Sequence, residues 1–399
     1  MPKRRSVSKK NASTTLVVLV VLFVLGIYYS VTGKTPGGGF ENGTAGPTPL
    51  IATALSPVVN APTAVNGSAD WWEVYFTDPM NVNNTANWQG SIEGRLIDKI
   101  NAAQTSIHIV SFEFDLTPVA EALIAAKQRG VDVRWVTDDE SGLGADEDPG
   151  RGQFALLQNA GIEVRADTRS ALMHNKFWIF DGQIAWTGST NITQSGVFEQ
   201  NNNTVIIHSS EVAAIYEREF AEMWNGQFGP KSPSTADQQS VVVNGTPIQI
   251  YFSPEDHVLD HMIPVISSAT SSIRFMAFSF TDYPLAKAML DRASAGLNVA
   301  GIFEKVGSET ESSELRTFYC AKVPARQDGN PRFLHDKVII VDNRFVISGS
   351  FNFSSNATDN NDENVIIIDN PTIANLYTQE FDRLWSIATD PAAGTFTCQ

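Results

Sequence analysis

The chain has 399 residues, of which 42% are hydrophobic and 18% charged, and its formal net charge is −16. This length suffices for two ordinary domains, and this composition excludes a wholly disordered protein. Residues 1–34 hold six of the 28 basic residues and no acid, so the rest of the chain has 22 basic against 44 acidic residues. The resulting charge of −22 argues against a protein that coats nucleic acid through a broad basic surface, although a small cationic pocket remains compatible with it.

The N-terminal segment combines a basic end with an apolar run. Residues 1–13 predict a basic cytoplasmic end, and residues 14–33 predict a transmembrane anchor or an export signal. Tyr28 and Tyr29 suit a membrane interface and no A-x-A cleavage site follows closely, which favours an uncleaved anchor. The positive-inside rule then places the remainder outside the cytoplasm, at the cell surface or in the periplasm. Cleavage of the segment would make the protein secreted.

Residues 34–70 are rich in Gly, Pro, Thr, Ala and Asn, and they predict a flexible linker. Beyond them the same order of elements occurs twice, which predicts one lobe at residues 71–232 and a second at 247–390. The first lobe is expected to contain helices at 96–103, 119–128 and 210–224 and strands at 107–112 and 131–137. The second is expected to contain helices at 262–269, 285–294 and 372–385 and strands at 273–278 and 297–303. This order predicts an α/β fold of two duplicated α-β-α sandwich lobes with partly parallel sheets.

A polar motif occurs once in each lobe with the same internal spacing. The first copy consists of His174, Lys176, Asp181, Ser189 and Asn191. The second copy consists of His335, Lys337, Asp342, Ser350 and Asn352. From His to Lys is two residues, from His to Asp seven and from His to Asn seventeen in both copies. This repetition indicates one site to which both lobes contribute.

The segments 174–180 and 335–341 are apolar enough to be strands. Residues two apart on a strand point to the same side, so each His shares a face with its Lys. Asp181 and Asp342 have the opposite parity, and we therefore expect an orienting or structural role for them within the motif. The Ser and Asn groups follow a second short strand in each lobe and could return to the same end of the sheet.

Two imidazoles, two ammonium groups and several hydroxyl and amide groups would line a pocket that fits a phosphodiester. The lysines and the Ser and Asn groups can hold nonbridging oxygens and neutralise charge in the transition state. One imidazole can attack phosphorus while the other protonates the leaving oxygen and then acts as base for water.

The pattern HxKx4D followed by GSxN, twice per chain, resembles the phospholipase D superfamily, including its phospholipase D-like and Nuc-type endonuclease-like proteins. The resemblance covers most of residues 72–390. It implies a two-lobed α-β-α sandwich with one active site at the lobe interface, a covalent phosphohistidine intermediate, and neither metal nor cofactor. By analogy His174 would be the nucleophile and His335 the acid, an assignment that the residues alone do not make.

Proteins similar to this chain often carry a Glu-Asn pair after the motif, whose carboxylate orients an imidazole. Glu363-Asn364 matches this pair, 28 residues after His335, but the same spacing from His174 leads to Asn202. An amide can accept a hydrogen bond from imidazole but stabilises imidazolium less than a carboxylate does. The difference predicts unequal pKa values and separate roles for the two histidines, unless the Asn run is only a polar turn.

The preferred function is a phosphodiesterase that hydrolyses a phospholipid such as phosphatidylcholine to phosphatidate, because an anchor would bring the site close to lipid headgroups. A nonspecific endonuclease that cleaves DNA or RNA is the first alternative, and a non-catalytic module that binds phosphorylated ligands is the second. The expected partners are therefore the phospholipid or nucleic-acid substrate and the membrane, with no obligate protein partner.

Two further groups have competing interpretations. Asp138 and Glu304 end equivalent strands and either edge the pocket or cap turns. His257 and His261 have the spacing of metal ligands on a helix, but a solvated helix start is the favoured interpretation.

The remaining aromatic and sulfur-containing candidates lie outside the motif. Trp71, Trp72 and Trp88 could contact a bilayer or substrate, with core packing as the favoured interpretation. Cys320 and Cys398 form a disulfide between the second lobe and the C-terminal tail, or are two unrelated thiols.

Overall fold

The computed structural model describes residues 63–79 and 90–398, and the predictions for residues 1–13 and 14–33, most of the linker and Trp88 lie outside this part. Within the described ranges, no helix combines the length and the apolar character that crossing a membrane requires.

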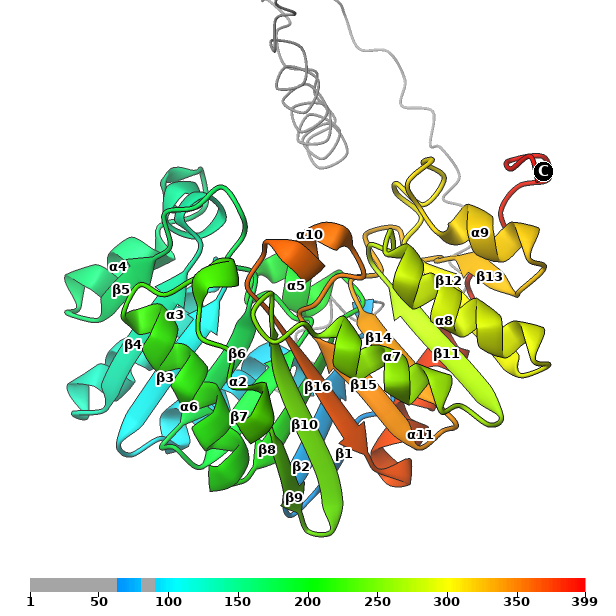
Figure 1. Cartoon of the computed structure of the whole chain (residues 1–399). Helices are drawn as coiled ribbons and strands as arrows, with labels where there is room; N and C mark the ends of the chain where they lie inside the picture. Colours follow the sequence, from blue (N-terminus) through cyan, green and yellow to red (C-terminus); the bar gives the residue numbers. More distant parts are fainter. Residues whose placement is uncertain (1–62, 80–89, 399) are drawn as a thin grey trace, which may run out of the picture. The chain divides into compact units, whose positions relative to one another are not determined.

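The first lobe is built on a mixed eight-stranded sheet in the order β1-β2-β8-β7-β6-β3-β4-β5 (Figure 1). Its strands are β1 (Gly67–Ala69), β2 (Trp72–Phe76), β3 (Ser106–Ser111), β4 (Asp132–Thr137), β5 (Glu163–Ala166), β6 (Lys176–Phe180), β7 (Ile184–Gly188) and β8 (Asn203–His208). Its helices are α2 (Ile92–Ala102), α3 (Thr117–Gln128), α4 (Gln153–Asn159), α5 (Gln194–Phe198) and α6 (Ser210–Trp224).

The second lobe repeats this topology in the order β13-β12-β11-β14-β15-β16-β10-β9. Its strands are β9 (Ser240–Val243), β10 (Thr246–Ser253), β11 (Ser272–Ala277), β12 (Asn298–Phe303), β13 (Ala325–Gln327), β14 (Lys337–Val341), β15 (Phe345–Gly349) and β16 (Glu363–Asp369). Its helices are α7 (Leu259–Ser267), α8 (Tyr283–Ser294), α9 (Leu315–Cys320), α10 (Ser355–Asp359) and α11 (Pro371–Trp385).

The prediction of two α/β lobes with partly parallel sheets is confirmed. β3, β4 and β5 are parallel, as are β11, β12 and β13, whereas the other pairs are antiparallel. Helices α3 and α8 begin two residues before the predicted positions, because a proline in the first turn of each helix favours an earlier start.

Short edge strands extend both sheets beyond the predicted lobe boundaries. β1 lies within the segment predicted as flexible linker, which was wrong for these residues, because Gly67–Ala69 pairs with β2. A side chain at Gly67 would come within 2.5 Å of Leu376 in α11, so glycine permits this approach. β9 joins β10 through Asn244 and Gly245, which have positive φ values of 47° and 78° and suit a tight hairpin.

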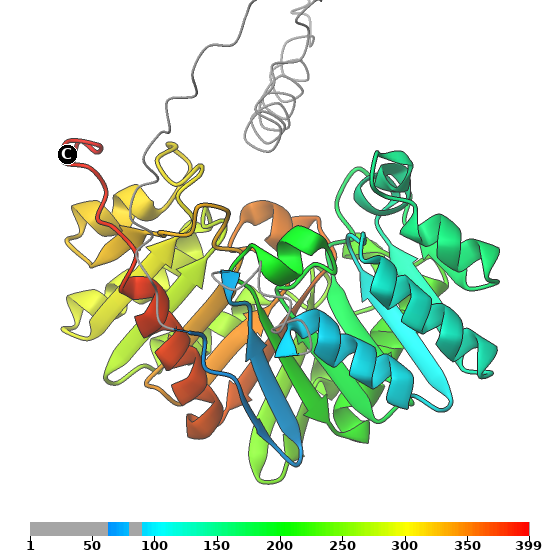
Figure 2. The same ribbon diagram turned by 180° about the vertical axis from the view of Figure 1, so that it is seen from behind.

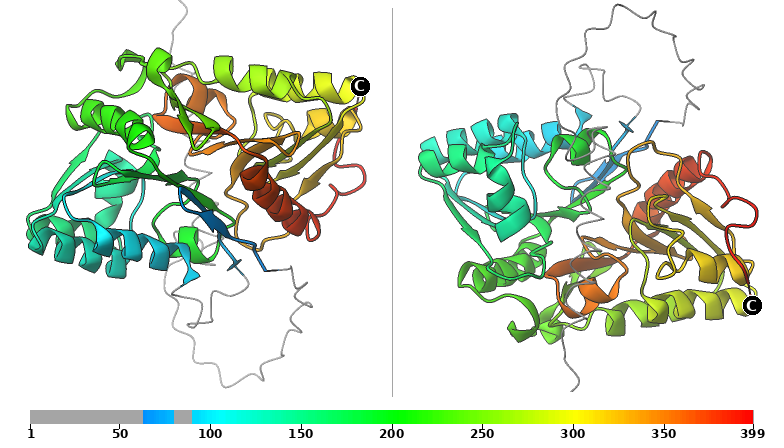
Figure 3. Two further views of the ribbon diagram at one scale, coloured as in Figure 1. Left: turned by 90° about the horizontal axis from the view of Figure 1, so that it is seen from below. Right: turned by 90° about the horizontal axis from the view of Figure 1, so that it is seen from above.

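Three apolar clusters form the interior of the two lobes. One lies under α2 and α3 in the first lobe and one under α7 and α8 in the second. The third joins α6, α11 and the facing sides of both sheets. Figure 1 shows α6, α7 and α8 on the near side and Figure 2 shows α2 and α11 on the other side. Viewed from above or below, the lobes are related by an approximate twofold rotation (Figure 3).

The described tryptophan candidates pack in the core, and the two cysteines form a disulfide. Trp72 is buried in the central core and Trp71 packs against it, in agreement with the core-packing interpretation. Cys320, at the end of α9, forms a disulfide with Cys398, so the pairing that the sequence left open is present.

Candidate active site

Both motif histidines lie immediately before a central strand and close to the other lobe. His174 and His335 are 5% and 6% exposed. The predicted strands at 174–180 and 335–341 begin two residues later than expected, at the lysines, because the preceding backbone pairs with the opposite lobe. The His174 amide donates to the Asp362 carbonyl and the His335 amide to the Asn201 carbonyl, each over 2.9 Å. The main chain of each lobe therefore positions the histidine of the other.

The side-chain partners of the histidines also come from the opposite lobes. Nδ1 of His174 lies 2.7 Å from Oε2 of Glu363, and Nδ1 of His335 lies 2.8 Å from Oδ1 of Asn202. The sequence paired each histidine with a downstream position but did not reveal this exchange. One imidazole thus has a carboxylate partner and the other an amide partner.

The orientation of the Asn202 amide is fixed by two further contacts. Its Nδ2 donates to the Gly196 carbonyl over 2.8 Å, and its Oδ1 accepts a 2.8 Å hydrogen bond from the Ser189 hydroxyl. The oxygen therefore faces His335, and the His335 Nδ1 carries the donated proton. Asn202 therefore accepts a hydrogen bond from His335 in a fixed orientation, and it is not only part of a polar turn.

The GSxN segments support this arrangement through their backbone. Gly188 and Gly349 have φ values of 145° and 136°, and a Cβ at either would come within 2.2 Å of a carbonyl oxygen in the adjacent strand. The Ser189 and Ser350 hydroxyls accept hydrogen bonds from the amides of Asn203 and Asn364. Both serines are fully buried and support the adjacent strands in this way, while their expected contact with nonbridging phosphate oxygens stays a prediction.

The asparagines of the GSxN segments are more exposed to solvent than the serines. Asn191 is 7% exposed, and its Nδ2 lies 3.4 Å from Oε2 of Glu113. Asn352 is half-buried, and its Oδ1 has no hydrogen-bond partner. These amides retain capacity to bind a ligand.

Lys176 and Lys337 place two ammonium groups in the buried region. Each Nζ donates to the carbonyl of its own motif histidine, over 2.8 Å for Lys176 and 2.6 Å for Lys337. In the part of the chain that the structure describes, neither lysine forms a salt bridge with a carboxylate. A buried cation without an ion-pair partner is costly, so an anionic ligand would compensate both charges.

Burial lowers the pKa of all four motif bases. It holds the pKa of His174 and of His335 well below its usual value, and the neighbouring lysines lower both further. Burial also lowers the pKa of Lys176 to about 8, with the Glu363 charge opposing this shift. The pKa of Glu363 is raised to about 8 by burial, while Lys176 acts in the opposite direction. These shifts favour neutral imidazoles.

Two phenylalanines that the sequence analysis did not single out pack against the histidines and lysines. Phe112 lies 4.8 Å from the His174 ring and 5.1 Å from Lys176 Nζ, measured to ring centroids. Phe278 has the same relation to His335, at 4.7 Å, and to Lys337, at 4.9 Å. Both residues end equivalent predicted strands, and this equivalence was the available signal.

A second pair of cross-lobe contacts joins the residue between each His and Lys to the opposite lobe. Asn364 Nδ2 donates to Asn175 over 2.9 Å, and Asn203 Nδ2 donates to Asp336 over 2.6 Å. Burial raises the pKa of Asp336 to about 7. These contacts interlock the lobes directly behind the histidines.

Asp138 and Glu304 hold the backbone just before the histidines. Asp138 accepts a hydrogen bond from the Met173 amide over 3.1 Å, and Glu304 accepts one from the Leu334 amide over 2.6 Å. Asp138 also accepts from the amides of Glu140 and Ser141, as a turn-capping residue does. Both interpretations of these acids thus apply, since they cap turns and support the pocket edge.

The motif aspartates lie apart from the histidines, at the far ends of β6 and β14. Asp181 accepts hydrogen bonds from the backbone amides of residues 104–106, and Asp342 from those of residues 270–272. The length of a strand separates each aspartate from its His, so neither carboxylate joins the catalytic group. Their position matches the structural role expected from strand parity.

His257 and His261, for which a solvated helix start was the favoured interpretation, lie just before and within α7. His261 stacks on Tyr251 at 3.7 Å and His257 is exposed, as a solvated helix start requires. Among the described residues, Asp138, Asp139 and Asp167 have ligand atoms within 4.8 Å of one another. However, backbone amides already occupy both Asp138 oxygens, and Arg169 lies 3.5 Å from Asp167.

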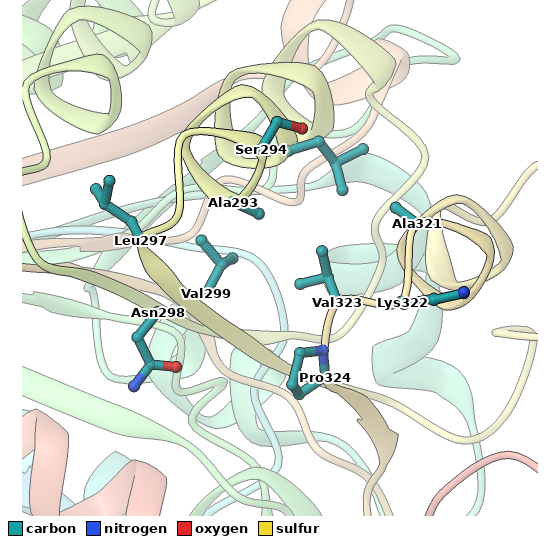
Figure 4. A pocket seen from close by; sticks show the side chains of 10 residues that line it. Ala293, Ser294, Leu297, Asn298, Val299, Ala321, Lys322, Val323 and Pro324 are labelled. Atoms are coloured by element: carbon teal, nitrogen blue, oxygen red, sulfur yellow. The ribbon is translucent and has the colours of Figure 1, made fainter.

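A cavity of about 230 Å³ lies elsewhere, at the edge of the second lobe between the end of α8 and the segment after α9. Figure 4 shows its mainly aliphatic lining, including Leu297, Val299, Val323 and Pro324. It contains no motif residue and is separate from the candidate active site.

Comparison with known proteins identifies the family. The family model described as "Cardiolipin synthase, PLD-like domain" matches residues 96–224 and 262–385, one match in each lobe. The chain therefore belongs to this phospholipase D-like family.

Several curated relatives match about a third of the chain. The mitochondrial cardiolipin hydrolase of Xenopus laevis is 34% identical over 130 residues, which cover 33% of this chain and 60% of that protein. The human protein of the same name is 35% identical over 137 residues, covering 34% and 52%. A phospholipase D of Rickettsia bellii is 32% identical over 130 residues, covering 33% and 65%. The chain thus spans less than two thirds of each of these relatives.

Two solved structures are similar to this chain. Nuc of Salmonella typhimurium, a phospholipase D family member, is 34% identical and is covered to 98%, over 37% of this chain, with a TM-score of 0.36. Phosphatidylserine synthase of Haemophilus influenzae is 15% identical over 79% of this chain and 87% of its own, with a TM-score of 0.58. The latter likeness extends across both lobes and concerns the fold.

Proposed function

We propose that the protein is a phosphodiester hydrolase of the phospholipase D type that converts a phospholipid, such as phosphatidylcholine, to phosphatidate. The observation that carries this proposal is the pairing of two buried histidines with partners from opposite lobes, beside two lysines that form no salt bridge with a carboxylate of the described residues. An anionic phosphodiester offsets part of the positive charge of the two lysines, and the two imidazoles supply a nucleophile and an acid.

In the first step, His174 attacks phosphorus and forms a phosphohistidine. Burial and the two lysines keep its imidazole neutral, so a ring nitrogen lone pair is available. Glu363 faces the other ring nitrogen and balances the positive charge that the ring gains when the new bond forms. This partner favours His174 over His335 as the nucleophile.

As this bond forms, His335 protonates the leaving oxygen, and the bond between phosphorus and that oxygen breaks. His335 then takes a proton from water, which attacks phosphorus and breaks its bond to His174, so phosphatidate leaves and both histidines are restored. Burial, Lys337 and Lys176 hold the pKa of His335 below the usual value. The negative charge of a bound phosphodiester offsets both lysines, which raises the pKa of His335 and favours its protonated form. An amide partner leaves this imidazole free to exchange its charge during the cycle, whereas a carboxylate would hold it as imidazolium.

The substrate class is supported by the names of the relatives, which include cardiolipin hydrolases and a phospholipase D. The apolar run at 14–33 would also tether the catalytic part to a membrane, on its extracytoplasmic side. A membrane tether would bring lipid phosphodiesters close to the site.

The purified full chain tests this proposal on phosphatidylcholine vesicles and on plasmid DNA in parallel. We expect release of choline and phosphatidate without DNA nicking, and loss of turnover in both His174→Ala and His335→Ala. DNA nicking without lipid turnover would replace the lipid substrate with a nucleic acid. Full activity of either variant on bis-p-nitrophenyl phosphate would refute the two-histidine mechanism.

A further inference from the structure

A side-chain bridge joins the two lobes five residues before each motif histidine. In the half that contains His335, this bridge is neutral. Asn330 donates from Nδ2 to Oδ1 of Asn201 over 2.7 Å and to the Glu199 carbonyl over 3.1 Å. Asn201 directly precedes Asn202, whose amide faces the His335 ring. A neutral bridge therefore lies next to a neutral imidazole partner.

The matching bridge in the half that contains His174 is an ion pair. Arg169 donates from Nη2 to the Asp362 carboxylate, and from Nη1 to the Asn360 carbonyl over 3.3 Å. Asp362 directly precedes Glu363, whose carboxylate faces the His174 ring. Both contacts have a counterpart at the same spacing in the other half, but here the bridge and the imidazole partner are ionisable.

Asp362 is enclosed between the two lobes and the segment that connects them. It is 1% exposed, and its Oδ1 accepts a 2.6 Å hydrogen bond from the amide of Gly229, in the segment after α6. The Arg169 guanidinium lies against the same glycine, where a Cβ would come within 1.9 Å of Nη1. The Asp362 carboxylate is therefore held from two sides, which compensates its burial.

The backbone of Asp362 connects this bridge to the histidine. Its carbonyl accepts a hydrogen bond from the His174 amide, and its own amide donates to the Leu172 carbonyl, each over 2.9 Å. Glu363, the next residue, contacts the His174 ring over 2.7 Å. A displacement of Asp362 would therefore move both the backbone of His174 and the partner of its ring.

The charge of Arg169 also affects the neighbouring acids. Burial raises the pKa of Asp362 to about 7, and the Arg169 guanidinium acts against this shift. Glu363 raises the pKa of Asp362 further, because two neighbouring carboxylates repel each other. Without Arg169, ionisation of one acid would oppose ionisation of the other. With it, Glu363 can balance the charge that the His174 ring gains.

We propose that Arg169 and Asp362 are positioning residues for the attack of His174 on the phosphodiester. This inference rests on the proposed function. The bridge holds the His174 backbone and Glu363 in place, because attack on phosphorus tolerates little displacement of the nucleophile. A charge-assisted hydrogen bond is roughly twice as strong as a neutral one, so the ionic bridge suits the histidine that forms the covalent bond.

The attack step can be isolated in the full chain carrying His335→Ala, because an aryl leaving group needs no acid and the phosphohistidine then accumulates. The measurement is the rate of p-nitrophenolate release in a single turnover of bis-p-nitrophenyl phosphate. Adding Arg169→Gln should slow this release roughly tenfold. Arg169→Lys retains the cation, and it should restore the rate to within about threefold of the His335→Ala value.

The matched control is Asn330→Ala in the same background, which removes the neutral bridge of the other half. It should change the release rate by less than about twofold, because Asn330 does not contact the Asp362 segment. An equal loss in Arg169→Gln and Asn330→Ala would overturn the proposal, since both bridges would then only dock the lobes. So would an unchanged rate in Arg169→Gln.

Should Arg169→Gln fail to fold, Asp362→Asn replaces it and copies Asn201 of the other half. This variant weakens the bridge and keeps its shape, so it should slow the release by about threefold or more. A release rate equal to that of His335→Ala alone would count against the positioning role.

A second readout does not depend on turnover. In the chain labelled with ¹⁵N-histidine, the proton between His174 Nδ1 and Glu363 should give an NMR signal that is absent in His174→Ala. This signal should shift or broaden in Arg169→Gln and stay unchanged in Asn330→Ala. An identical signal in Arg169→Gln and the wild type would overturn the positioning role. A chain that releases no p-nitrophenolate would instead refute the proposed function, and this signal alone would then decide the positioning role.

Discussion

Glu363 and Asn202 contact the two histidines through the same ring nitrogen, but Glu363 can ionise and Asn202 cannot. A carboxylate favours imidazolium more than an amide does, so the proton affinities of the two rings respond differently to a bound phosphate. At the residue scale, this one difference is what separates nucleophile from acid in the proposed mechanism.

Asn202→Asp tests this separation through the pH dependence of hydrolysis. The new carboxylate faces His335 Nδ1 and raises the pKa of His335. An acid must be protonated when the reaction starts, so activity falls as the pH rises through its pKa. Raising that pKa should move the alkaline limb of the kcat/KM profile upward by about one pH unit. The measurement is kcat/KM against pH on bis-p-nitrophenyl phosphate.

The matched control is Asn201→Asp, which makes the same charge change at a side chain that contacts Asn330 and not the His335 ring. Its alkaline limb should stay near that of the wild type. An equal shift in both variants, or no shift in Asn202→Asp, would contradict the role of His335.

Sequence reasoning at this scale identified the residues but not their partners. The equal spacing identified both histidines and lysines, and counting 28 residues onward led to Glu363 and Asn202. It could not show that each partner serves the histidine of the other lobe, because chain distance carries no information on the docking of two lobes. Ser189 and Ser350 accept hydrogen bonds from backbone amides, and Ser189 also donates to Asn202, while their contact with phosphate stays a prediction.

At the scale of elements, Asp342 joins the end of β14 to the start of β11. Its carboxylate accepts hydrogen bonds from three backbone amides and two hydroxyls, which lower its pKa below the usual value although partial burial opposes them. The charged form thus contributes stability that is complete above the unfolded pKa of about 3.9 and is lost as the pH falls through the lower folded value.

Asp342→Asn should lower the free energy of unfolding by about 1–2 kcal/mol at pH 7, because an amide accepts these hydrogen bonds less strongly. The difference from the wild type should shrink below about pH 4. Urea unfolding at several pH values measures both effects, with exposed Asp382→Asn as control. A loss of hydrolysis at 25 °C without a loss of stability would indicate a catalytic role instead.

The disulfide between α9 and the C-terminal tail closes a long loop, since Cys320 and Cys398 are 78 residues apart. Cys398→Ser should lower the free energy of unfolding by about 2–4 kcal/mol, mainly because the unfolded chain gains freedom. Oxidised and reduced wild-type protein should differ by a similar amount in urea unfolding. An effect of dithiothreitol as large in Cys398→Ser as in the wild type would contradict this account.

The long helices and central strands could be predicted because their apolar periodicity is local. The edge strands β1 and β9 could not, since they are defined by pairing with β2 and β10 and have little periodicity of their own. The start of β6 was misplaced for a related reason, because the backbone of residues 173 and 174 pairs with Asp362 in the other lobe.

For the two lobes together, the central apolar core and the site depend on each other. Residues of both sheets, α6 and α11 share one buried cluster, and every motif histidine has its partner in the opposite lobe. The negative formal charge of the chain coexists with a buried cationic region, because Lys176 and Lys337 lie in the interior beside the two motif histidines. Duplication in one chain therefore supplies both halves of one site.

Separately produced lobes, divided between residues 232 and 236, should each be inactive because each lacks one partner of its histidine. Mixing them should restore hydrolysis as the central core reforms. The measurement is turnover of bis-p-nitrophenyl phosphate by each lobe and by the mixture. Activity in a single lobe at concentrations where it is monomeric would refute the shared site.

In the proposed mechanism, His174 carries the phosphoryl group, and His335 acts first as general acid and then as general base. His335→Ala should still react with an aryl phosphodiester, whose leaving group needs no acid, but should fail to activate water. Rapid quenching followed by peptide mass spectrometry should therefore find a phosphorylated His174 that accumulates in this variant. Phosphorylation of His335 in His174→Ala, with none on His174 in His335→Ala, would contradict the account.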